Sequence, residues 1–276
     1  MTDRLQNKTA LVTGSTNNIG RAIASALAAE GAHIIVSGRD ADRGADVVRE
    51  IRDAGGRADF VRADLTGDPA ASASLATETL ALTGGRLDIL VNNAGVYPRH
   101  STEDAGDDLF DLIYGVNVKA PFHLVQALVA PLTKSHGVIL NLGSWVARLA
   151  VPSSPLYSSS KAAMEALTRA WSSELGPRGI RVVGVSPGVI RPLGSDPDAP
   201  HSADTMMADA PAGRAGEASD IAAAAVYLVS DESVFVHGTT LDVDGGRANV
   251  AMSAERDADV DGGRANVAMS AERDAA

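Results

Sequence analysis

The segment Thr9-Ala10-Leu11-Val12-Thr13-Gly14-Ser15-Thr16-Asn17-Asn18-Ile19-Gly20 passes from a short apolar run through a turn into an alanine-rich stretch. The run 9–13 is typical of a buried strand, and residues 19–30 have the composition of a helix. Glycine at a strand-to-helix turn permits a sharp bend, and the N-terminus of the helix that follows favours a pyrophosphate. The segment therefore predicts a βα unit whose turn binds a dinucleotide.

We expect the two glycines of this turn to have different structural roles. Gly14 fits the bend and Gly20 fits the contact between helix and strand, whereas the middle position is Asn18. After glycine, asparagine tolerates the left-handed backbone conformation best, although its Cβ would stand near the phosphates. The predicted contacts to the cofactor in this segment are Gly14, Asn17, Asn18, Ile19 and Gly20.

The same alternation of apolar runs and helical stretches continues through most of the chain. Strands are expected at 9–13, 33–37, 59–63, 87–92, 138–142, 181–185 and 240–243. Helices are expected at 19–30, 42–54, 69–83, 104–116, 120–133, 155–175 and 218–228. Continuous apolar strands that alternate with helices indicate a parallel sheet covered on both faces. We therefore predict an α/β protein with a single doubly wound domain, residues 1–247, around a sheet of about seven parallel strands.

Composition excludes several other classes of protein. The chain has 276 residues, a formal charge of −11 and a pI near 4.9, which argues against nucleic acid or an anionic membrane as partner. It has no cysteine, which excludes disulfides and thiolate metal sites, and no metal site is expected. No apolar run approaches the roughly 18 residues of a membrane span. We expect a soluble, cytoplasmic protein.

Two segments interrupt the alternation. Residues 187–215 hold many glycines and prolines, and we interpret them as a mobile substrate lid, with simple disorder as the alternative. The seventeen residues 242–258 recur without change at 259–275. Two copies are too few for a solenoid. We expect 248–276 to be a tail whose second copy is poorly ordered and passive.

Polar residues gather where the predicted strands end. Asp64-Leu65 follows the third strand, and Asn92-Asn93-Ala94-Gly95 follows the fourth. Ser37-Gly38-Arg39-Asp40 ends the second strand, where a carboxylate selects the ribose of NAD and an arginine accommodates the 2′-phosphate of NADP. We favour NADP through Arg39, with NAD possible if Asp40 turns back to the ribose and Arg39 is a surface charge. Asp64, Leu65 and Asn93 complete the predicted cofactor contacts in this part of the chain.

Tyr157 and Lys161 form the most informative pair of side chains. At i and i+4 they share one helix face, with Cβ atoms roughly 5–6 Å apart. Here the lysine charge would draw the tyrosine pKa down from about 10, which suits a general acid/base. Ser144, on an earlier segment, would donate a hydrogen bond to a carbonyl or alkoxide oxygen. Any helix can also carry such a pair without function.

Taken together, these residues resemble the short-chain dehydrogenase/reductase family, in its short single-domain branch. The resemblance runs from about Leu5 to Gly246 and rests on motifs in the family's order and approximate spacing: Thr13-Gly14 with Gly20, Asp64, Asn92-Asn93-Ala94-Gly95, Asn117, Ser144, Tyr157, Lys161 and Pro187-Gly188. The family usually has glycine at the position of Asn18, and many members that prefer NADP have a basic residue at that of Asn17. The resemblance implies a Rossmann sheet and a homotetramer.

The resemblance also assigns roles to the catalytic set Asn117, Ser144, Tyr157 and Lys161. Tyr157 would be the general acid/base, and Lys161 would lower its pKa and bind the nicotinamide ribose. Ser144 would orient the substrate oxygen, and Asn117 would hold a water that links Lys161 to solvent. The backbone of Ile190, after Pro187-Gly188, would contact the carboxamide.

The function implied is an NAD(P)-dependent oxidoreductase that interconverts a ketone and a secondary alcohol. An enoyl reductase of the same fold usually has a longer spacing between tyrosine and lysine than the three residues found here. The alternative of another class is a catalytically silent regulator that binds NAD(P) on the same scaffold. We expect a pocket lined by Trp145, Val146, Arg148, Leu149, Val151, Leu156 and residues of the lid. Arg148 is either a carboxylate contact or a surface charge, and His201 is expected to be exposed.

Overall fold

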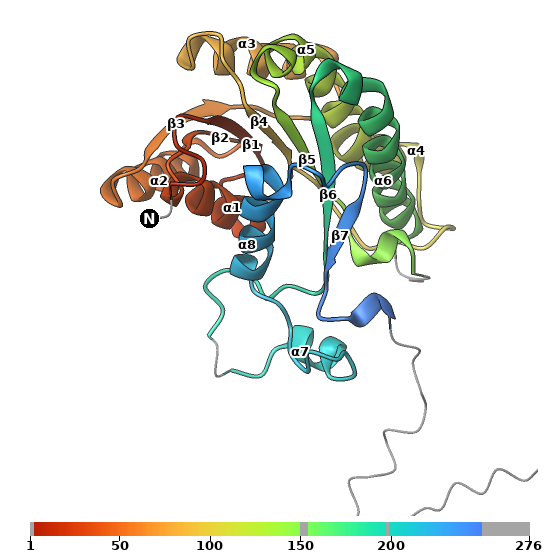
Figure 1. The fold of residues 1–276 in the computed structure, drawn as a ribbon. Helices are drawn as coiled ribbons and strands as arrows, with labels where there is room; N and C mark the ends of the chain where they lie inside the picture. The colour runs from red at the N-terminus through yellow and green to blue at the C-terminus, as the bar shows by residue number, and fades with distance from the viewer. Residues whose placement is uncertain (1–2, 150–153, 197–198, 250–276) are drawn as a thin grey trace, which may run out of the picture.

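The computed structural model describes residues 3–149, 154–196 and 199–249. Seven parallel strands form one sheet in the order β3-β2-β1-β4-β5-β6-β7, which confirms the predicted fold class (Figure 1). The strands are β1 (Thr9–Thr13), β2 (His33–Gly38), β3 (Arg57–Arg62), β4 (Ile89–Asn92), β5 (Val138–Leu142), β6 (Arg181–Pro187) and β7 (Thr240–Val243). The order reverses between β1 and β4, so a crevice opens at the carboxyl ends of these two strands.

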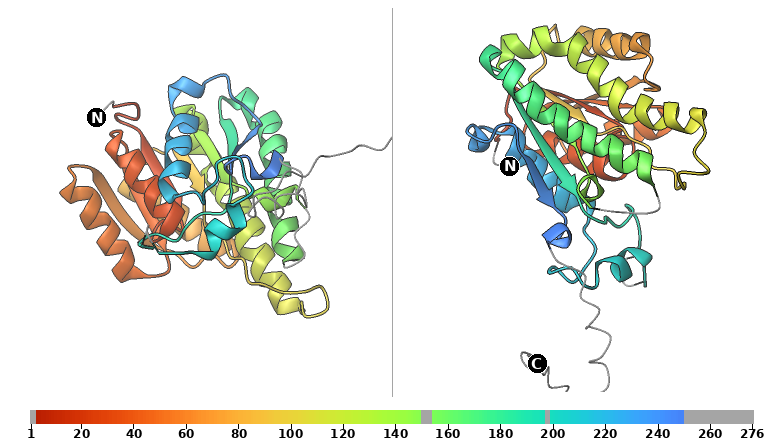
Figure 2. Two further views of the ribbon diagram at one scale, coloured as in Figure 1. Left: turned by 90° about the horizontal axis from the view of Figure 1, so that it is seen from below. Right: turned by 90° about the vertical axis from the view of Figure 1, so that its right-hand side faces the viewer.

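Helices cover both faces of the sheet. They are α1 (Asn18–Ala29), α2 (Ala41–Asp53), α3 (Pro69–Leu82), α4 (Asp107–Tyr114), α5 (Ala120–Ser135), α6 (Pro155–Leu175), α7 (Ser202–Met207) and α8 (Ala218–Val229). Helices α1, α2 and α8 lie on one face, and α3 to α6 lie on the other (Figures 1 and 2). Side chains of successive strand residues point to opposite faces, which explains why the strands are apolar throughout. Thus Ala10 and Val12 belong to the core under α1 and α8, while Leu11 belongs to the core under α5 and α6.

The helices α4 and α5 are joined by a π-helical turn, Gly115–Lys119, instead of the break expected from the sequence. The resulting helical stretch Asp107–Ser135 is long and apolar enough to cross a membrane by length and composition, although the sequence analysis found no such run. Half of its most apolar window is buried within the protein. That burial explains the composition, because Leu124, Leu128 and Leu132 pack into the core under α5.

The described part of residues 187–215 is folded, which contradicts the alternative of simple disorder, while the interpretation as a mobile substrate lid stays a prediction. It contains α7, whose Ala203 and Met207 pack with Ala210 and Ala215 in a small core of their own. An ion pair between Arg191 and Asp204 ties the start of the segment to this helix. Figures 1 and 2 show α7 beyond the carboxyl end of β6, apart from both helical layers.

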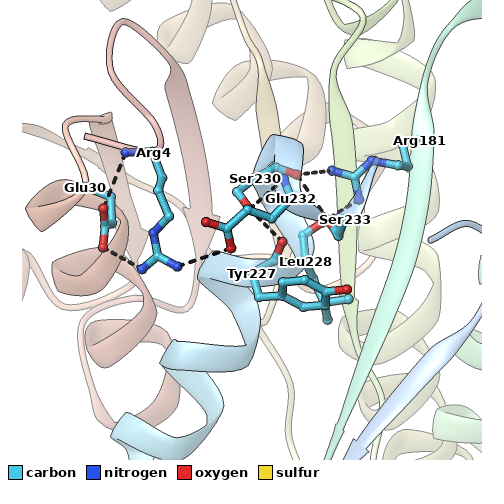
Figure 3. Close-up of polar contacts among 8 residues, drawn as sticks. All are labelled: Arg4, Glu30, Arg181, Tyr227, Leu228, Ser230, Glu232 and Ser233. Atoms are coloured by element: carbon cyan, nitrogen blue, oxygen red, sulfur yellow. Dashed lines mark hydrogen bonds and ion pairs between the residues drawn. The ribbon is translucent and has the colours of Figure 1, made fainter. Parts of the chain in front are cut away.

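The amino end of the sheet, opposite the crevice, is fastened by charged side chains. Arg4 pairs with Glu30 at 2.6 Å and with Glu232 at 3.6 Å, while the Arg181 guanidinium donates to the backbone oxygens of Leu228 and Ser230 (Figure 3). These contacts join the end of α8 to the start of β6 and the end of α1. Residues 250–276 lie outside the described residues, so the boundary at 247 and the tail remain predictions.

Candidate active site

The turn after β1 has the geometry that its glycines predict. Gly14 has φ of +63°, in the left-handed region that favours glycine. A Cβ on Gly20 would lie 2.4 Å from the Gly14 oxygen, so only glycine lets the start of α1 approach the turn this closely. The sequence therefore determines both the bend and the distance between strand and helix.

Asn18 takes the left-handed conformation that the sequence analysis allowed for it, with φ of +42°. The Asn17 side chain caps α1 by accepting a hydrogen bond of 2.8 Å from the Asn18 amide. The two asparagines thus form the turn itself.

Asn93 fastens the end of β4 to this turn. Its side-chain amide donates to the backbone oxygens of Thr13 at 2.8 Å and Gly14 at 3.0 Å. The Thr13 hydroxyl in turn accepts hydrogen bonds of 3.0 Å from the amides of Asn93 and Ala94. Asn92 points away into the core, where its amide donates to Asn141 on β5. The polar residues after β4 therefore shape the crevice as well as line it.

A crevice of about 440 Å³ follows the carboxyl ends of β1, β2 and β4. Every cofactor residue predicted from the first four strands lines it: Gly14, Asn17, Asn18, Ile19, Gly20, Arg39, Asp64, Leu65 and Asn93. Asn18 Oδ1 and Ser37 Oγ are buried without a hydrogen-bond partner among the described residues. Because the rim is polar and such atoms favour a polar ligand, the crevice fits the adenosine and pyrophosphate of a dinucleotide.

Arg39 and Asp40, the two candidate contacts to the adenosine ribose, follow the end of β2 and differ in their surroundings. The Asp40 carboxylate caps α2, accepting a 3.0 Å bond from the Arg43 amide, and pairs with the Arg43 side chain at 2.5 Å. These bonds, the amide first, lower the pKa of Asp40. Arg39 stays exposed on the crevice wall, 3.9 Å from Asp64. Arg43 also lines the crevice, a basic residue that sequence reasoning missed because its proximity depends on how α2 is set against the sheet.

A second cavity of about 420 Å³ adjoins the crevice and contains Ser144, Tyr157 and Lys161. Five residues line both spaces: Asn18, Ile19, Asn93, Gly95 and Val96. Ile190 lines the second cavity, as do Trp145, Met206 and Tyr97. The shared residues place the two spaces next to each other, with Arg39 on the wall of the first and Tyr157 on the wall of the second.

Tyr157 lies in the first turn of α6 and lines the second cavity together with Ser144. Burial raises the pKa of Tyr157, and the nearby Ser144 hydroxyl opposes this effect only in part. The expected lowering by Lys161 is therefore wrong for the protein alone. Burial disfavours the phenolate more than the surrounding groups stabilise it.

Lys161 is buried one turn further along α6. Its ammonium donates a 2.8 Å bond to the Leu142 oxygen and lies 5.8 Å from the centre of the Tyr157 ring. Burial lowers the pKa of Lys161 to about 8. The buried charge lacks a carboxylate partner among the described residues around it, which explains the direction of the shift.

Asn117 lies in the π-helical turn and joins three elements. Its Oδ1 accepts a 2.9 Å bond from the Val96 amide, and its Nδ2 donates 3.0 Å bonds to the Val96 oxygen and to Ser160 Oγ. Single π-turns within helices occur often at functional sites, and this one directs a buried amide towards α6. The side chain therefore fixes the strand end after β4 against the helix that carries Tyr157 and Lys161.

Other expectations for the pocket are met only in part. Trp145 and Val146 line the cavity. Arg148 instead pairs with Glu165 on α6 and with Asp242 on β7. It is therefore neither a contact to a substrate carboxylate in the cavity nor a free surface charge. Leu149 and Leu156 are absent from the described lining, and Val151 lies outside the described residues. His201 lines the cavity and caps α7 through Nδ1, so the expectation of an exposed residue without partner is wrong.

Comparison with known proteins agrees with this geometry. The sequence model of a family described as enoyl-(acyl carrier protein) reductase matches residues 14–248. Cyclopentanol dehydrogenase from Comamonas sp. strain NCIMB 9872 is 37% identical over 246 residues, which cover 88% of this chain and 98% of that protein. The Escherichia coli 3-oxoacyl-acyl-carrier-protein reductase FabG is 35% identical over 247 residues, covering 87% and 97%.

A solved structure is similar over the same span. The blue fluorescent protein from a metagenomic library, in complex with NADPH, superposes with a TM-score of 0.81 at 34% identity, over 89% of this chain and 99% of that one. The chain therefore belongs to the short-chain dehydrogenase/reductase family, and it is an oxidoreductase of that family.

Proposed function

We propose that this protein is an NADP(H)-dependent oxidoreductase that interconverts a ketone and a secondary alcohol. The observation that carries the proposal is that Ser144, Tyr157 and Lys161 line one cavity, which adjoins a crevice lined by the glycine turn and by Arg39. The identities of the relatives, among them a dehydrogenase of a cyclic secondary alcohol and a reductase of 3-oxoacyl thioesters, support the same chemistry. The short spacing of Tyr157 and Lys161 favours carbonyl over enoyl reduction.

Residues of the crevice and of the cavity would bind different parts of the cofactor. The turn from Gly14 to Gly20 would hold the pyrophosphate at the start of α1, and Asp64, Leu65 and Asn93 would flank the adenosine side. Ile190 and Lys161 would hold the nicotinamide end. When bound, the nicotinamide supplies or accepts a hydride, which is the difficult part of the chemistry.

The protein itself supplies the proton and the orientation of the substrate oxygen. A raised pKa keeps Tyr157 protonated near neutral pH, which suits a general acid that donates to a carbonyl oxygen. Ser144 would donate a second hydrogen bond to the same oxygen. Lys161, charged below a pH of about 8, would stabilise negative charge that develops at the Tyr157 oxygen. A protonated Tyr157 is the form that ketone reduction requires.

The cavity also limits the substrate. Its walls are mainly apolar or aromatic, with Tyr97, Trp145 and Met206 among them. Arg99, Lys161 and His201 line it too, and no carboxylate does in the described part of the chain. An uncharged or anionic ketone of small to medium size is therefore favoured over a cationic one.

Arg39 should determine the preference for NADP. Arg39→Ala removes a charge-assisted contact to the 2′-phosphate and is expected to weaken NADPH binding by about 10- to 100-fold. NADH binding should change little, because that cofactor has no phosphate there. Titration calorimetry with both cofactors measures the two effects. Arg49→Ala is the matched control, since Arg49 lies on α2, pairs with Asp46 and does not line the crevice. Equal losses for both cofactors would refute the assignment.

The activity itself is tested by following NADPH oxidation with a panel of ketones. Cyclopentanone and a 3-oxoacyl thioester represent the chemistry of the two relatives. Oxidation with at least one ketone supports the proposal. Firm NADPH binding without oxidation across the panel would support the silent regulator instead.

We further propose a cytoplasmic homotetramer. Apolar side chains exposed on the single chain support an assembly: Leu112 and Phe122 on α4 and α5, and the fully exposed Phe235 before β7. Exposed apolar side chains that form a contiguous patch often mark an interface between proteins.

A further inference from the structure

His100 is a buried histidine whose side chain contacts the first turn of the catalytic helix. It is only 8% exposed, at the end of the segment that follows β4. The Leu156 amide donates to His100 Nε2 at 3.2 Å, and His100 Nδ1 lies 2.9 Å from the Pro98 oxygen. Leu156 directly precedes Tyr157.

The two contacts define one protonation form of the ring. A backbone amide can only donate, so Nε2 must be the acceptor, and Nδ1 then carries the proton and donates to Pro98. The neutral Nδ1–H tautomer satisfies both bonds at once. A doubly protonated ring, or the Nε2–H tautomer, cannot accept from Leu156.

The hydrogen bond from Leu156 to His100 supplies an acceptor to an amide in the first turn of α6. The first amides of a helix lack partners within it, and a side chain near the N-cap often accepts from one of them. Ser154, at the N-cap of α6, makes no capping bond from its side chain to the described first turn. His100, 56 residues before Leu156 in the sequence, accepts a hydrogen bond from the Leu156 amide instead.

The segment from Val96 to His100 is thereby attached to α6 at both ends. At its start, Asn117 holds the Val96 backbone and Ser160 together. At its end, His100 holds Leu156, one helical turn before Ser160. Between the two attachments, the Tyr97 ring lies 5.7 Å from the ring of Tyr157.

We propose that His100 is a positioning residue for the reaction, an inference that rests on the proposed function of Tyr157. Through Leu156 it fixes the opening turn of α6, and through Pro98 it fixes the segment that sets Tyr97 against Tyr157. His100 does not line the cofactor crevice or the substrate cavity. Its loss should therefore displace the phenol without removing a contact to either ligand.

Two substitutions separate the bonds that the ring makes. Glutamine places a side-chain oxygen near the position of Nε2 and retains an acceptor for Leu156, whereas asparagine places its amide near Nδ1 and retains only the bond to Pro98. We expect His100→Asn to lower kcat for ketone reduction by about tenfold, because small misplacements of a catalytic group are costly. His100→Gln should keep more than half of the wild-type kcat. NADPH affinity should be unchanged in both. Equal kcat values for the two variants would overturn the proposal.

A measurement on the unmodified protein covers the case in which a variant does not fold. The nitrogen chemical shifts of the His100 ring distinguish the tautomers, and we expect the proton on Nδ1 with a hydrogen-bonded Nε2. A proton on Nε2 would overturn the proposal without any variant. If Tyr157→Phe instead retains activity, the proposed role of Tyr157 fails, whatever the His100 variants show.

Discussion

Tyr157→Phe is expected to lower kcat for ketone reduction by about 10²–10⁴-fold, the usual worth of a positioned general acid. Phenylalanine keeps the ring that packs against Tyr97 but removes the proton donor. The loss should therefore appear in kcat, while the Kd of NADPH, measured by fluorescence titration, stays close to that of the wild type.

Tyr227→Phe is the matched control. Tyr227 lies on α8 and lines neither the crevice nor the cavity. Its substitution should leave kcat unchanged, so a comparable loss in both variants would indicate a general defect of the protein. A Tyr157→Phe variant with more than half of the wild-type activity would remove Tyr157 from the mechanism.

Lys161→Met should produce the second large effect. Methionine fills much of the lysine volume but supplies no charge and no donor to the Leu142 oxygen. We expect kcat/KM for NADPH to fall by about 10²–10³-fold, the usual cost of losing one preorganised donor at a reacting centre. Steady-state rates with NADPH varied at a saturating ketone concentration measure this loss.

The pH dependence of the wild type gives an independent check on Lys161. Burial lowers the pKa of Lys161 to about 8, so the ammonium is present below this pH and is lost as the pH rises through it. Because kcat/KM for NADPH reports on groups of the free enzyme, it should decline as the pH rises through about 8. Tyr157, whose pKa is raised, stays protonated in this range. A decline that persists unchanged in Lys161→Met would assign it to another group.

Much of the fold follows from local sequence signals. The strands Thr9–Thr13, Val138–Leu142 and Thr240–Val243 and the helix Pro155–Leu175 have the predicted bounds, because apolar runs and proline at a helix start mark them strongly. Other elements differ by one to three residues at an end. Helix α4, for example, begins at Asp107 after a Gly106 N-cap, instead of at residue 104.

Helix α7 was not predicted, for a physical reason. It has only six residues, and its buried contacts are Ala203 and Met207 against Ala210 and Ala215. So few small side chains give no periodic pattern in sequence. Their packing depends on Val189 and on the ion pair of Arg191 with Asp204, which only the folded chain brings together.

The residues of the candidate site can be predicted from the sequence, but the pKa shifts of their side chains cannot. The glycine turn, Ser144, Tyr157 and Lys161 carry local motifs that the structure brings to adjoining spaces. The pKa of Tyr157 depends on whether burial or a neighbouring charge has the larger effect, and that depends on how deeply α6 is buried against the sheet. The sequence separation of Tyr157 and Lys161 does not show this depth. The partners of Arg148 and His100 are likewise far away in the sequence.

Hydride transfer between NADP(H) and a ketone can be followed with NADPH in which both hydrogens at the transferring carbon of the nicotinamide are deuterium. We expect mass spectrometry to find one deuterium on the carbinol carbon of the alcohol product, and we expect Tyr157→Phe to form this product far more slowly. Absence of label in any product, despite firm binding of NADPH, would contradict the proposed hydride transfer.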